Sequence, residues 1–506
     1  MKLRSLSEST RFYESGNYLL SFIKEKKMKR FWLVLLSLGL IMAFSVSAFA
    51  VDVKVSADYY VGGLYLNKTS VHNGFETYNP QQPSFDPTPA NPSTAFFYQD
   101  LRVGADFIVA PCLKLVTQFD AMERIWGGMR SDVDVPDAHG AGTRAEAENI
   151  SIRQVHIDYT SPIGLFKVGY LEDFVFGTVF GDSSSGPTSG QIQYFIQKGP
   201  FTGFLGYAKE VDNSASAVTS STVTDNDFDS YRIAGIYNFK GGEAGALFMW
   251  NRDATNKVSA TPPAGPYLSN VFVIDPYVKA KIGPVALQAE AQYWFGDAMK
   301  WEGIGPNPAN VSVSALSVFV DATADFNMFY AGGSFAYLSG DDNSKKDQVT
   351  GGVNTGGLDW NPCLIMFNQD LNYWAGNIAG HGLTQPGYSG YSSVDSEMSN
   401  AWFFQGRVGI KPTAQWNVLL AVSYAMADKK PGFYDLTNHY FSYPNSTYGT
   451  EIDLTATYKI TNNLSYMLGA GYLFTGDYFK GFDAYQLATA KVNDDYMLIN
   501  KLTLSF

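Results

Sequence analysis

The sequence predicts an all-β fold: a transmembrane, antiparallel, up-and-down β-barrel of about 18 strands, within a range of about 16 to 20. Three observations predict this fold. Apolar and polar residues alternate along much of the chain, which gives a strand two different faces. Short turns and long polar loops alternate between these runs. After residue 50 the chain has no apolar run of about 18 residues, so helices would not carry it across a membrane.

The N-terminal region contains a secretory signal peptide, which we place at residues 28–50. A basic start, an apolar run and a small-x-small cleavage site follow one another, as export requires. These parts are Lys29 with Arg30, the run 31–43, and Ala48 with Ala50. The alternative is a single membrane anchor, but the apolar run is shorter than the ~20 residues of a spanning helix.

Residues 1–27 are polar, with charges of both signs, and do not belong to such a signal. We expect translation to begin at Met28 and residues 1–27 to be a misannotated extension. Residues 51–506 would then form the barrel with its extracellular loops. No plug domain of the kind found in plugged transporters is expected ahead of the first strand.

The connections between the alternating runs give the strand number. Eight are short and rich in Gly, Pro and Asn, which favour tight turns. They lie at 110–113, 160–164, 198–200, 240–242, 282–284, 324–326, 411–414 and 460–463. Nine are long and polar, and lie at 67–96, 125–147, 175–188, 211–228, 253–268, 298–310, 340–397, 428–447 and 479–492. Seventeen connections join 18 strands, with both termini on the short-turn side.

The direction in which side chains point follows from the alternation. In the run 285–293, Gln288, Glu290 and Gln292 are expected to point inward and the apolar residues outward, as lipid demands. The strand at 150–159 changes phase near Arg153, which predicts a β-bulge. Outward aromatic residues near strand ends are expected to form interfacial girdles. They are Tyr159, Phe201, Phe239, Trp416, Tyr458, Phe474 and Phe506.

The longest loop, 340–397, contains apolar runs too short to span a membrane, so we expect it to pack into or over the barrel mouth. The loop 175–188 is the rival for narrowing the pore, although it is short for that task. Cys363 lies in the long loop and Cys112 in a turn at the opposite end. We expect these cysteines to be unpaired, because a disulfide needs Cα atoms within about 7 Å.

The last strand resembles the C-terminal assembly signal of Gram-negative outer-membrane barrels. Tyr496, Leu502, Leu504 and the terminal Phe506 share one face of that strand. The whole of 51–506 resembles outer-membrane porins, and the stretches 97–103, 159–170 and 177–182 are similar to porin-like proteins of deltaproteobacteria. The resemblance implies an outer-membrane location, contact with lipid and with the barrel-assembly machinery through Phe506, passive diffusion of small hydrophilic solutes, and often a homotrimer.

Charged residues at inward positions are the candidates for the pore wall and its constriction, because such charges set the selectivity of a channel. They are Arg102, Asp106, Asp120, Asp158, Lys167, Arg232, Glu290, Arg407, Glu451 and Asp453. By resemblance to porins, a basic wall would face an acidic one across the opening. The formal net charge of −12 and the acidic loops favour weak cation preference and argue against nucleic acid as a partner.

Two further classes of function stay open at this stage. The barrel could be the sheath of an electron-conduit complex, or a protein of loop-mediated binding or adhesion. An outer-membrane hydrolase is less favoured, since it needs a His beside an acidic or Ser residue, and the pairs available are His156 with Asp158 and Asp435 with His439. The sequence contains no haem-attachment motif, and we expect no catalytic residue, cofactor or metal.

Overall fold

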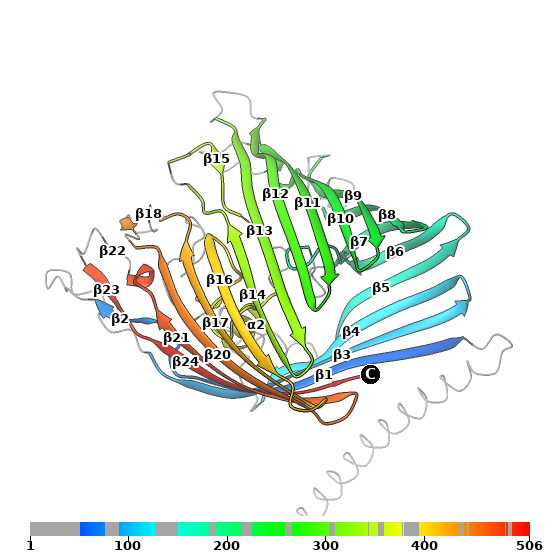
Figure 1. Ribbon diagram of the computed structural model, residues 1–506. Coiled ribbons are helices and arrows are strands. Elements are labelled where there is room, and N and C mark those ends of the chain that lie inside the picture. The colour runs from blue at the N-terminus through cyan, green and yellow to red at the C-terminus, as the bar shows by residue number, and fades with distance from the viewer. Residues whose placement is uncertain are drawn as a thin grey trace, which may run out of the picture.

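Antiparallel strands close into a barrel in the computed structural model (Figure 1). The structure describes residues 51–75, 91–126, 150–173, 175–181, 188–214, 225–258, 266–302, 309–342, 344–352, 359–376, 378, 394–430, 432–434, 440–442, 445–480, 482–483 and 488–506. The expected signal peptide, its cleavage residues Ala48 and Ala50, and residues 1–27 lie outside this part of the chain.

The barrel wall of the described residues contains 18 strands, as predicted. They are β1(Asp52–Leu66), β3(Thr94–Ala110), β4(Leu113–Ile125), β5(Ile150–Ser161), β6(Gly164–Glu172), β7(Thr188–Lys198), β8(Phe201–Asp212), β9(Asp227–Phe239), β10(Gly242–Asp253), β11(Tyr267–Ile282), β12(Val285–Trp301), β13(Val311–Phe326), β14(Phe329–Leu338), β16(Ala401–Ile410), β17(Trp416–Ala427), β20(Thr447–Lys459), β21(Leu464–Thr475) and β24(Asp495–Ser505). A two-residue strand, β15(Gln348–Val349), pairs in parallel with the end of β13.

Closure is made by β1, which pairs with β3 on one side and with β24 on the other. The terminal residue takes part in it. The backbone N–H of Phe506 donates to the carbonyl of Ala57 at 3.0 Å, and the N–H of Ala57 donates to the carbonyl of Phe506 at 2.9 Å. Closure removes the unpaired strand edges that a membrane cannot tolerate. Among the described residues, no helix has the length and apolar character needed to cross a membrane.

Seven of the eight predicted turns lie where the sequence placed them, and one is shifted along the chain. The turn between β13 and β14 is at Asn327–Met328, not at 324–326. Asn327 has a φ of 68°, a left-handed conformation that Asn tolerates better than most residues. Its N–H donates to Oδ1 of Asp325 at 2.9 Å, so the Asp side chain supports the turn from within the strand.

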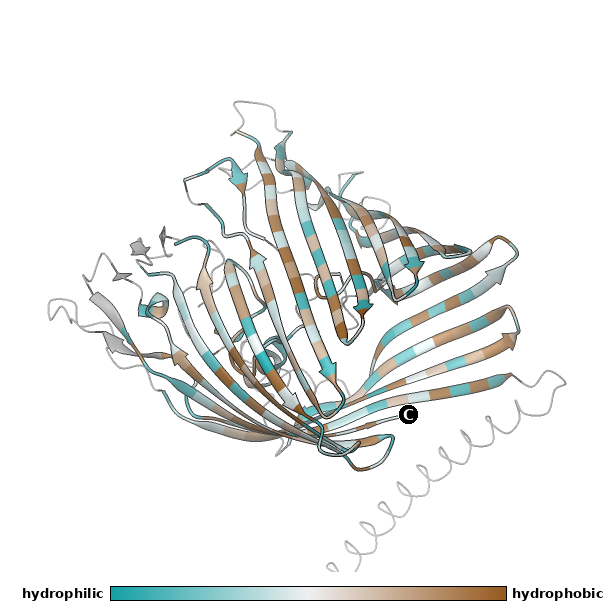
Figure 2. Cartoon of the chain, in the orientation of Figure 1, coloured by the Kyte–Doolittle hydropathy of each residue, from teal (hydrophilic) through white to brown (hydrophobic). Residues whose placement is uncertain are grey.

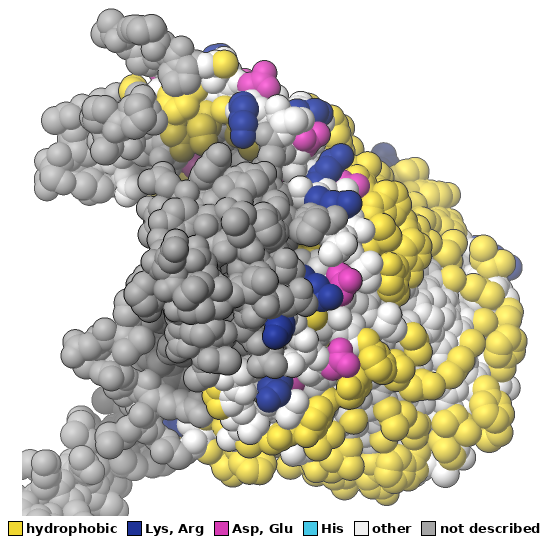
Figure 3. Space-filling view, turned by 90° about the vertical axis from the view of Figure 1, so that its left-hand side faces the viewer, with side chains coloured by type: hydrophobic (Ala, Val, Ile, Leu, Met, Phe, Trp, Pro, Cys, Tyr) yellow, Lys and Arg dark blue, Asp and Glu magenta, His cyan; other side chains and the backbone are white. Residues whose placement is uncertain are grey.

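Side chains alternate across the wall as predicted, and bands of opposite hydropathy follow one another along the strands (Figure 2). On β12, Glu290 and Gln292 are buried inside while Tyr293 is exposed outside. Hydrophobic side chains cover the outer wall in Figure 3, and charged side chains gather along the edge of that apolar region. The predicted bulge is confirmed, because the register between β4 and β5 shifts so that Arg153 has no partner across the ladder.

Aromatic rings form rows on the outer surface near both ends of the strands. At the long-loop end, Trp250 stacks between Tyr231 and Phe272, with centroid distances of 5.0 and 6.2 Å. At the short-turn end, Trp416 lies 4.8 Å from Tyr458. All seven aromatic residues predicted for girdles are exposed. Such rings are suited to the interface between lipid and water.

A second, five-stranded sheet lies at the long-loop end and was not predicted. Its strands are β2(His72–Phe75), β18(Gly432–Tyr434), β19(Tyr440–Ser442), β22(Phe482–Asp483) and β23(Ala488–Val492). They belong to three different long connections, so backbone pairing ties these loops together. The strands have two to five residues each, too few for the alternation of a sequence to reveal.

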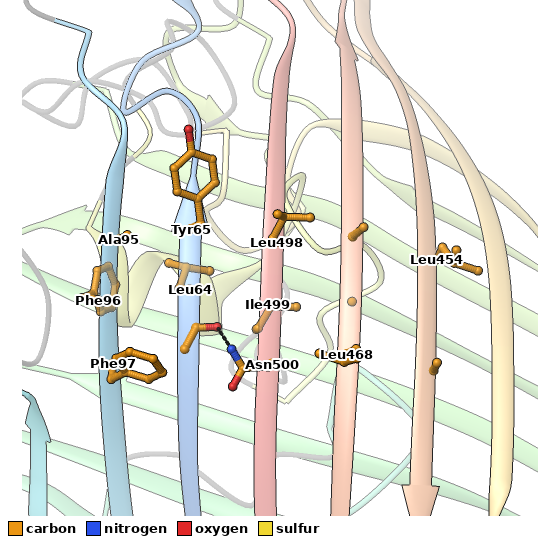
Figure 4. A pocket seen from close by; sticks show the side chains of 14 residues that line it. Leu64, Tyr65, Ala95, Phe96, Phe97, Leu454, Leu468, Leu498, Ile499 and Asn500 are labelled. Atoms are coloured by element: carbon orange, nitrogen blue, oxygen red, sulfur yellow. Dashed lines mark hydrogen bonds between the residues drawn. The ribbon is translucent and has the colours of Figure 1, made fainter.

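An apolar hollow of about 560 Å³ lies over β3, β1, β24, β21 and β20, where the barrel closes (Figure 4). The exposed side chains of Leu468 and Leu498 border it. Asn500 shares their outward face, and its side chain donates to the carbonyl of Gly63 at 3.3 Å. A Cβ at Gly63 would lie 2.6 Å from the Asn500 amide nitrogen and from the Phe97 ring, so a larger residue there would displace these side chains. The lipid-facing surface thus carries one polar side chain beside an apolar recess.

Candidate pore constriction

The long loop enters the barrel through residues 359–376, which we call the long inward segment. It includes the helix α2(Gln369–Ala375), seen inside the barrel in Figure 1. Asn368 caps this helix, because its side chain accepts the N–H of Leu371 at 2.8 Å. Gly376 ends the helix with a φ of 81°. The predicted packing of loop 340–397 into the barrel is confirmed for this segment.

A carboxylate of the wall holds the long inward segment by its backbone. The N–H groups of Ile365 and Met366 donate to the two oxygens of Glu451, each at 2.7 Å. The N–H of Leu364 donates to Asp453 at 3.3 Å. A carboxylate that accepts two backbone N–H groups satisfies donors that a buried loop would otherwise leave unpaired.

Apolar packing holds the other part of the segment. Trp374 is 1% exposed and stacks on Tyr98 of β3, with ring centroids 4.6 Å apart. Phe367 is fully buried and packs edge-on against Phe403 of β16 and Tyr448 of β20. The helix therefore contacts the β3 side of the lumen, while the residues before it cover β16 and β20.

Residues 175–181 form a second, short inward segment. The backbone N–H groups of Val179 and Gly181 donate to Glu290 of β12 at 2.7 and 2.8 Å, and the Thr178 hydroxyl donates to it at 2.6 Å. Although the loop 175–188 was expected to be short for the task of narrowing the pore, its residues 175–181 do extend into the barrel. Seven residues suffice because a single wall carboxylate accepts the N–H groups of Thr178, Val179 and Gly181. Asp182 and the Ser-rich run after it lie outside the described residues.

The two inward segments meet inside the barrel. The rings of Phe180 and Trp360 lie edge to face, with centroids 6.1 Å apart. Phe180 has no exposed surface, and Phe176 packs on Tyr277 of β11 at 4.8 Å. Together the segments form a partition anchored at Glu290 on one side and at Glu451 on the other. The candidate constriction is therefore built from both loops that the sequence presented as rivals.

Charged side chains on β3 to β6 pair with one another along the wall. Arg102 donates to Asp120 at 2.8 Å, and Arg153 reaches the same carboxylate at 3.2 Å. Arg153 also contacts Glu172 at 2.5 Å. Because Arg153 is the bulged residue of β5, the bulge directs its side chain toward Asp120.

A second group of charges lies nearer the short turns. Lys114 bridges Asp106 at 2.8 Å and Asp158 at 3.3 Å. The buried His156 contacts Asp158 at 3.2 Å, the pair considered for a hydrolase. Lys167 lies opposite Asp158 in the strand register, and its ammonium group is 5.8 Å from the Phe195 ring.

The other two predicted arginines are also paired. Arg232 contacts Asp173, and its second nitrogen lies 3.0 Å from Glu210. Arg407 of β16 contacts Asp321 of β13 at 2.5 Å. The basic candidates are thus paired with acidic residues of neighbouring or nearby strands. The structure does not place them on separate walls facing each other, because alternating strands bring opposite charges into neighbouring registers.

Three predicted acidic residues are covered by the inward segments. Glu290 is 2% exposed, Glu451 has no exposed surface, and Asp453 is 6% exposed. They point inward as the alternation predicts, but they hold loops and do not face open lumen. By contrast, the Lys114 and Asp106 side chains are 36% and 33% exposed.

Sequence reasoning missed several residues of this region. Asp321 was not identified as the partner of Arg407, since strand register decides that pairing. The sequence placed Trp360 and Trp374 in a packed loop but did not indicate which aromatic rings they contact. The thiol of Cys363 lies buried against β20, and burial raises its pKa. The two cysteines are unpaired, as predicted.

No protein-family model matches the chain, and a search of curated protein sequences finds no match. Solved structures with a similar arrangement of strands include OccK9 (OpdG) of Pseudomonas aeruginosa, 12% identical over 90% of this chain and 99% of that chain, with a TM-score of 0.44. The outer membrane protein opdK of the same organism is 12% identical over 90% and 99%, with a TM-score of 0.43. The outer membrane channel DcaP of Acinetobacter baumannii is 12% identical over 91% and 99%, with a TM-score of 0.40. At this similarity, the fold assignment rests on the strand pairing of this chain.

Proposed function

We propose that the protein is a porin of the Gram-negative outer membrane: a water-filled channel for passive diffusion of small hydrophilic solutes and ions, with weak cation preference. One observation carries the proposal. An 18-stranded wall is apolar outside and lined inside by paired charges, while two loops narrow its interior without being part of the wall. Barrels of eight strands fill their own interior, whereas those of 16 to 18 leave an aqueous channel.

The charges that face the lumen support the ion preference. The formal net charge is −12, and among the described residues Asp100 forms no salt bridge, whereas Asp370 lies 3.9 Å from the ammonium group of Lys501. Carboxylates lining a pore favour cations over anions. Because most of the wall charges are paired within the wall, the expected preference is weak.

The location and partners follow from the same proposal. Residues 28–50 would direct export, Phe506 would be read by the barrel-assembly machinery, and the apolar outer face would contact outer-membrane lipid. A homotrimer is the proposed assembly. Asn500 and the hollow beside it support a protein neighbour at the closure of the barrel, since a polar side chain facing lipid is unfavourable. The resemblance to deltaproteobacterial porin-like proteins belongs to this proposal as well.

The alternatives have less support. A sheath for an electron conduit needs room in the lumen for a partner, and the inward segments occupy part of that room. Adhesion would depend on the outer loops, much of whose length lies outside the described residues. For a hydrolase, His156 is buried with Asp158 and Lys114, in an ion-paired group rather than beside a described nucleophile.

Single-channel recording of the refolded protein in a planar bilayer tests the proposal, with a salt gradient to read ion preference. Steady open-state currents and a small cation-selective reversal potential are expected. Uptake of a neutral sugar by vesicles containing the protein is the matching test for uncharged solutes. Folded protein that neither conducts nor admits the sugar would overturn the proposal.

A further inference from the structure

The long inward segment brings a thiol to two carboxylates of the wall. One ligand atom each of Cys363, Glu451 and Asp453 lies within 4.8 Å of the others. The three residues are 3%, 0% and 6% exposed. Glu451 and Asp453 share the inward face of β20, and Cys363 reaches them from the loop. The group is independent of the ion pairs on β3 to β6.

The group has too little positive charge around it. Within the described residues, no Lys, Arg or His forms an ion pair with Glu451 or Asp453. Backbone N–H groups satisfy Glu451 and one oxygen of Asp453. The other oxygen of Asp453, Oδ1, is buried without a hydrogen-bond partner in this part of the chain. Burying a carboxylate oxygen unpaired, next to a second carboxylate, is costly unless a proton or a cation lies between them.

The donor set fits a particular class of cation. Thiolate and carboxylate together suit borderline divalent ions such as Zn²⁺, which takes Cys sulfur and Asp or Glu oxygen in tetrahedral sites. Three protein ligands would leave one position for water. Binding through a thiolate releases the thiol proton, so affinity for the cation would increase with pH.

We propose that Cys363, Glu451 and Asp453 form a binding site for a divalent cation of the zinc class. Its ligands come from the loop and from the wall, so occupancy ties the long inward segment to β20. The site goes beyond the proposed channel function and does not depend on it. If the barrel transported nothing, the same three ligands would still bind the ion.

Cobalt(II) is the probe, because thiolate ligation gives it an intense charge-transfer absorption band. The refolded protein carries Cys112→Ser, which leaves Cys363 as the one thiol in the sequence. Cys112 is exposed in a turn at the opposite end, so this background leaves the site intact. One equivalent of Co²⁺ is expected to produce the band, and Zn²⁺ is expected to abolish it by displacement.

Two variants in the same background identify the ligands. Cys363→Ser should abolish the band. Asp453→Asn, which preserves shape, should weaken binding by at least the roughly 10–100-fold that loss of an outer-shell partner costs. Circular dichroism and the heat-dependent gel mobility of barrels establish that each variant is folded. Absence of the band in folded protein, or a band that persists in Cys363→Ser, would overturn the site and would indicate that the two carboxylates share a proton instead.

Discussion

The two sides of the lumen follow the same alternation but are used differently. On the ion-paired wall, β3 to β6, charged side chains contact each other, and some of them stay partly exposed, as with Lys114 and Asp106. On the covered wall, β16 to β21, inward residues such as Glu451 and Ser423 have no exposed surface. The difference comes from the loops. The long inward segment packs on the covered wall. That wall therefore supports the candidate constriction and does not line the open pore.

This contrast shows what an inward charge does in each setting. Where water remains, opposite charges on adjacent strands neutralise each other and contribute little to stability. Where a loop excludes water, a carboxylate must be satisfied by that loop, and it becomes the loop's anchor. Glu290 anchors the short inward segment in this way, and Glu451 anchors the long inward segment.

The largest effect should come from removing the stacking between the long inward segment and β3. Trp374→Ala deletes a nearly fully buried ring and is expected to cost about 3–5 kcal/mol of stability. Loosening of the loop should also increase open-channel conductance and current noise. Denaturant unfolding in vesicles and bilayer recording measure both effects. Trp416→Ala, on the exposed outer face, is the control; equal losses in the two variants would contradict the role of Trp374.

A smaller effect is expected from the anchor on the covered wall. Glu451→Gln replaces one acceptor oxygen by an NH₂ group, so one of the N–H groups of Ile365 and Met366 loses its partner. An unsatisfied buried donor costs about 1–3 kcal/mol. Hydrogen exchange of these two amides should accelerate. Glu290→Gln is the matched variant for the short inward segment, and should accelerate exchange at Val179 while leaving Ile365 unchanged.

On the ion-paired wall, one substitution should change selectivity more than stability. Arg102→Gln removes a lumen charge while Asp120 keeps its contact with Arg153, so the buried carboxylate is not left unpaired and the change in stability should be small. Cation preference should increase, read as a larger reversal potential in a salt gradient. The exposed Lys411, at a turn, provides the control Lys411→Gln. An unchanged reversal potential in Arg102→Gln would show that this wall does not face the ion path.

The smallest effect concerns an ion pair at the loops. The guanidinium of Arg252 and the ammonium of Lys257 lower the pKa of Asp225 to about 2. A lowered pKa stabilises the folded form above the ordinary value near 4, and this contribution is lost as the pH falls toward 2. Asp225 is 41% exposed, so Asp225→Asn should cost only about 0.2–1 kcal/mol at pH 7 and less at pH 2, where the carboxyl is partly protonated. Unfolding at the two pH values tests this.

Much of the wall could be predicted from the sequence because alternation is a local property. The strand number, the facing of β12 and the bulge at Arg153 all follow from it. The pairing of Arg407 with Asp321 could not be predicted, since it depends on which registers meet across two interfaces. The covering of Glu451 could not be predicted either, because it depends on the path of a loop with no repeating pattern.

The central claim is that loops narrow an otherwise open channel. Comparison of single-channel conductance between the wild type and a variant whose residues 360–375 are replaced by a Gly/Ser linker tests it most directly. Both proteins should form steady channels, and the variant should conduct more and admit larger neutral sugars into vesicles. Equal conductance and equal size exclusion in the two folded proteins would contradict the claim.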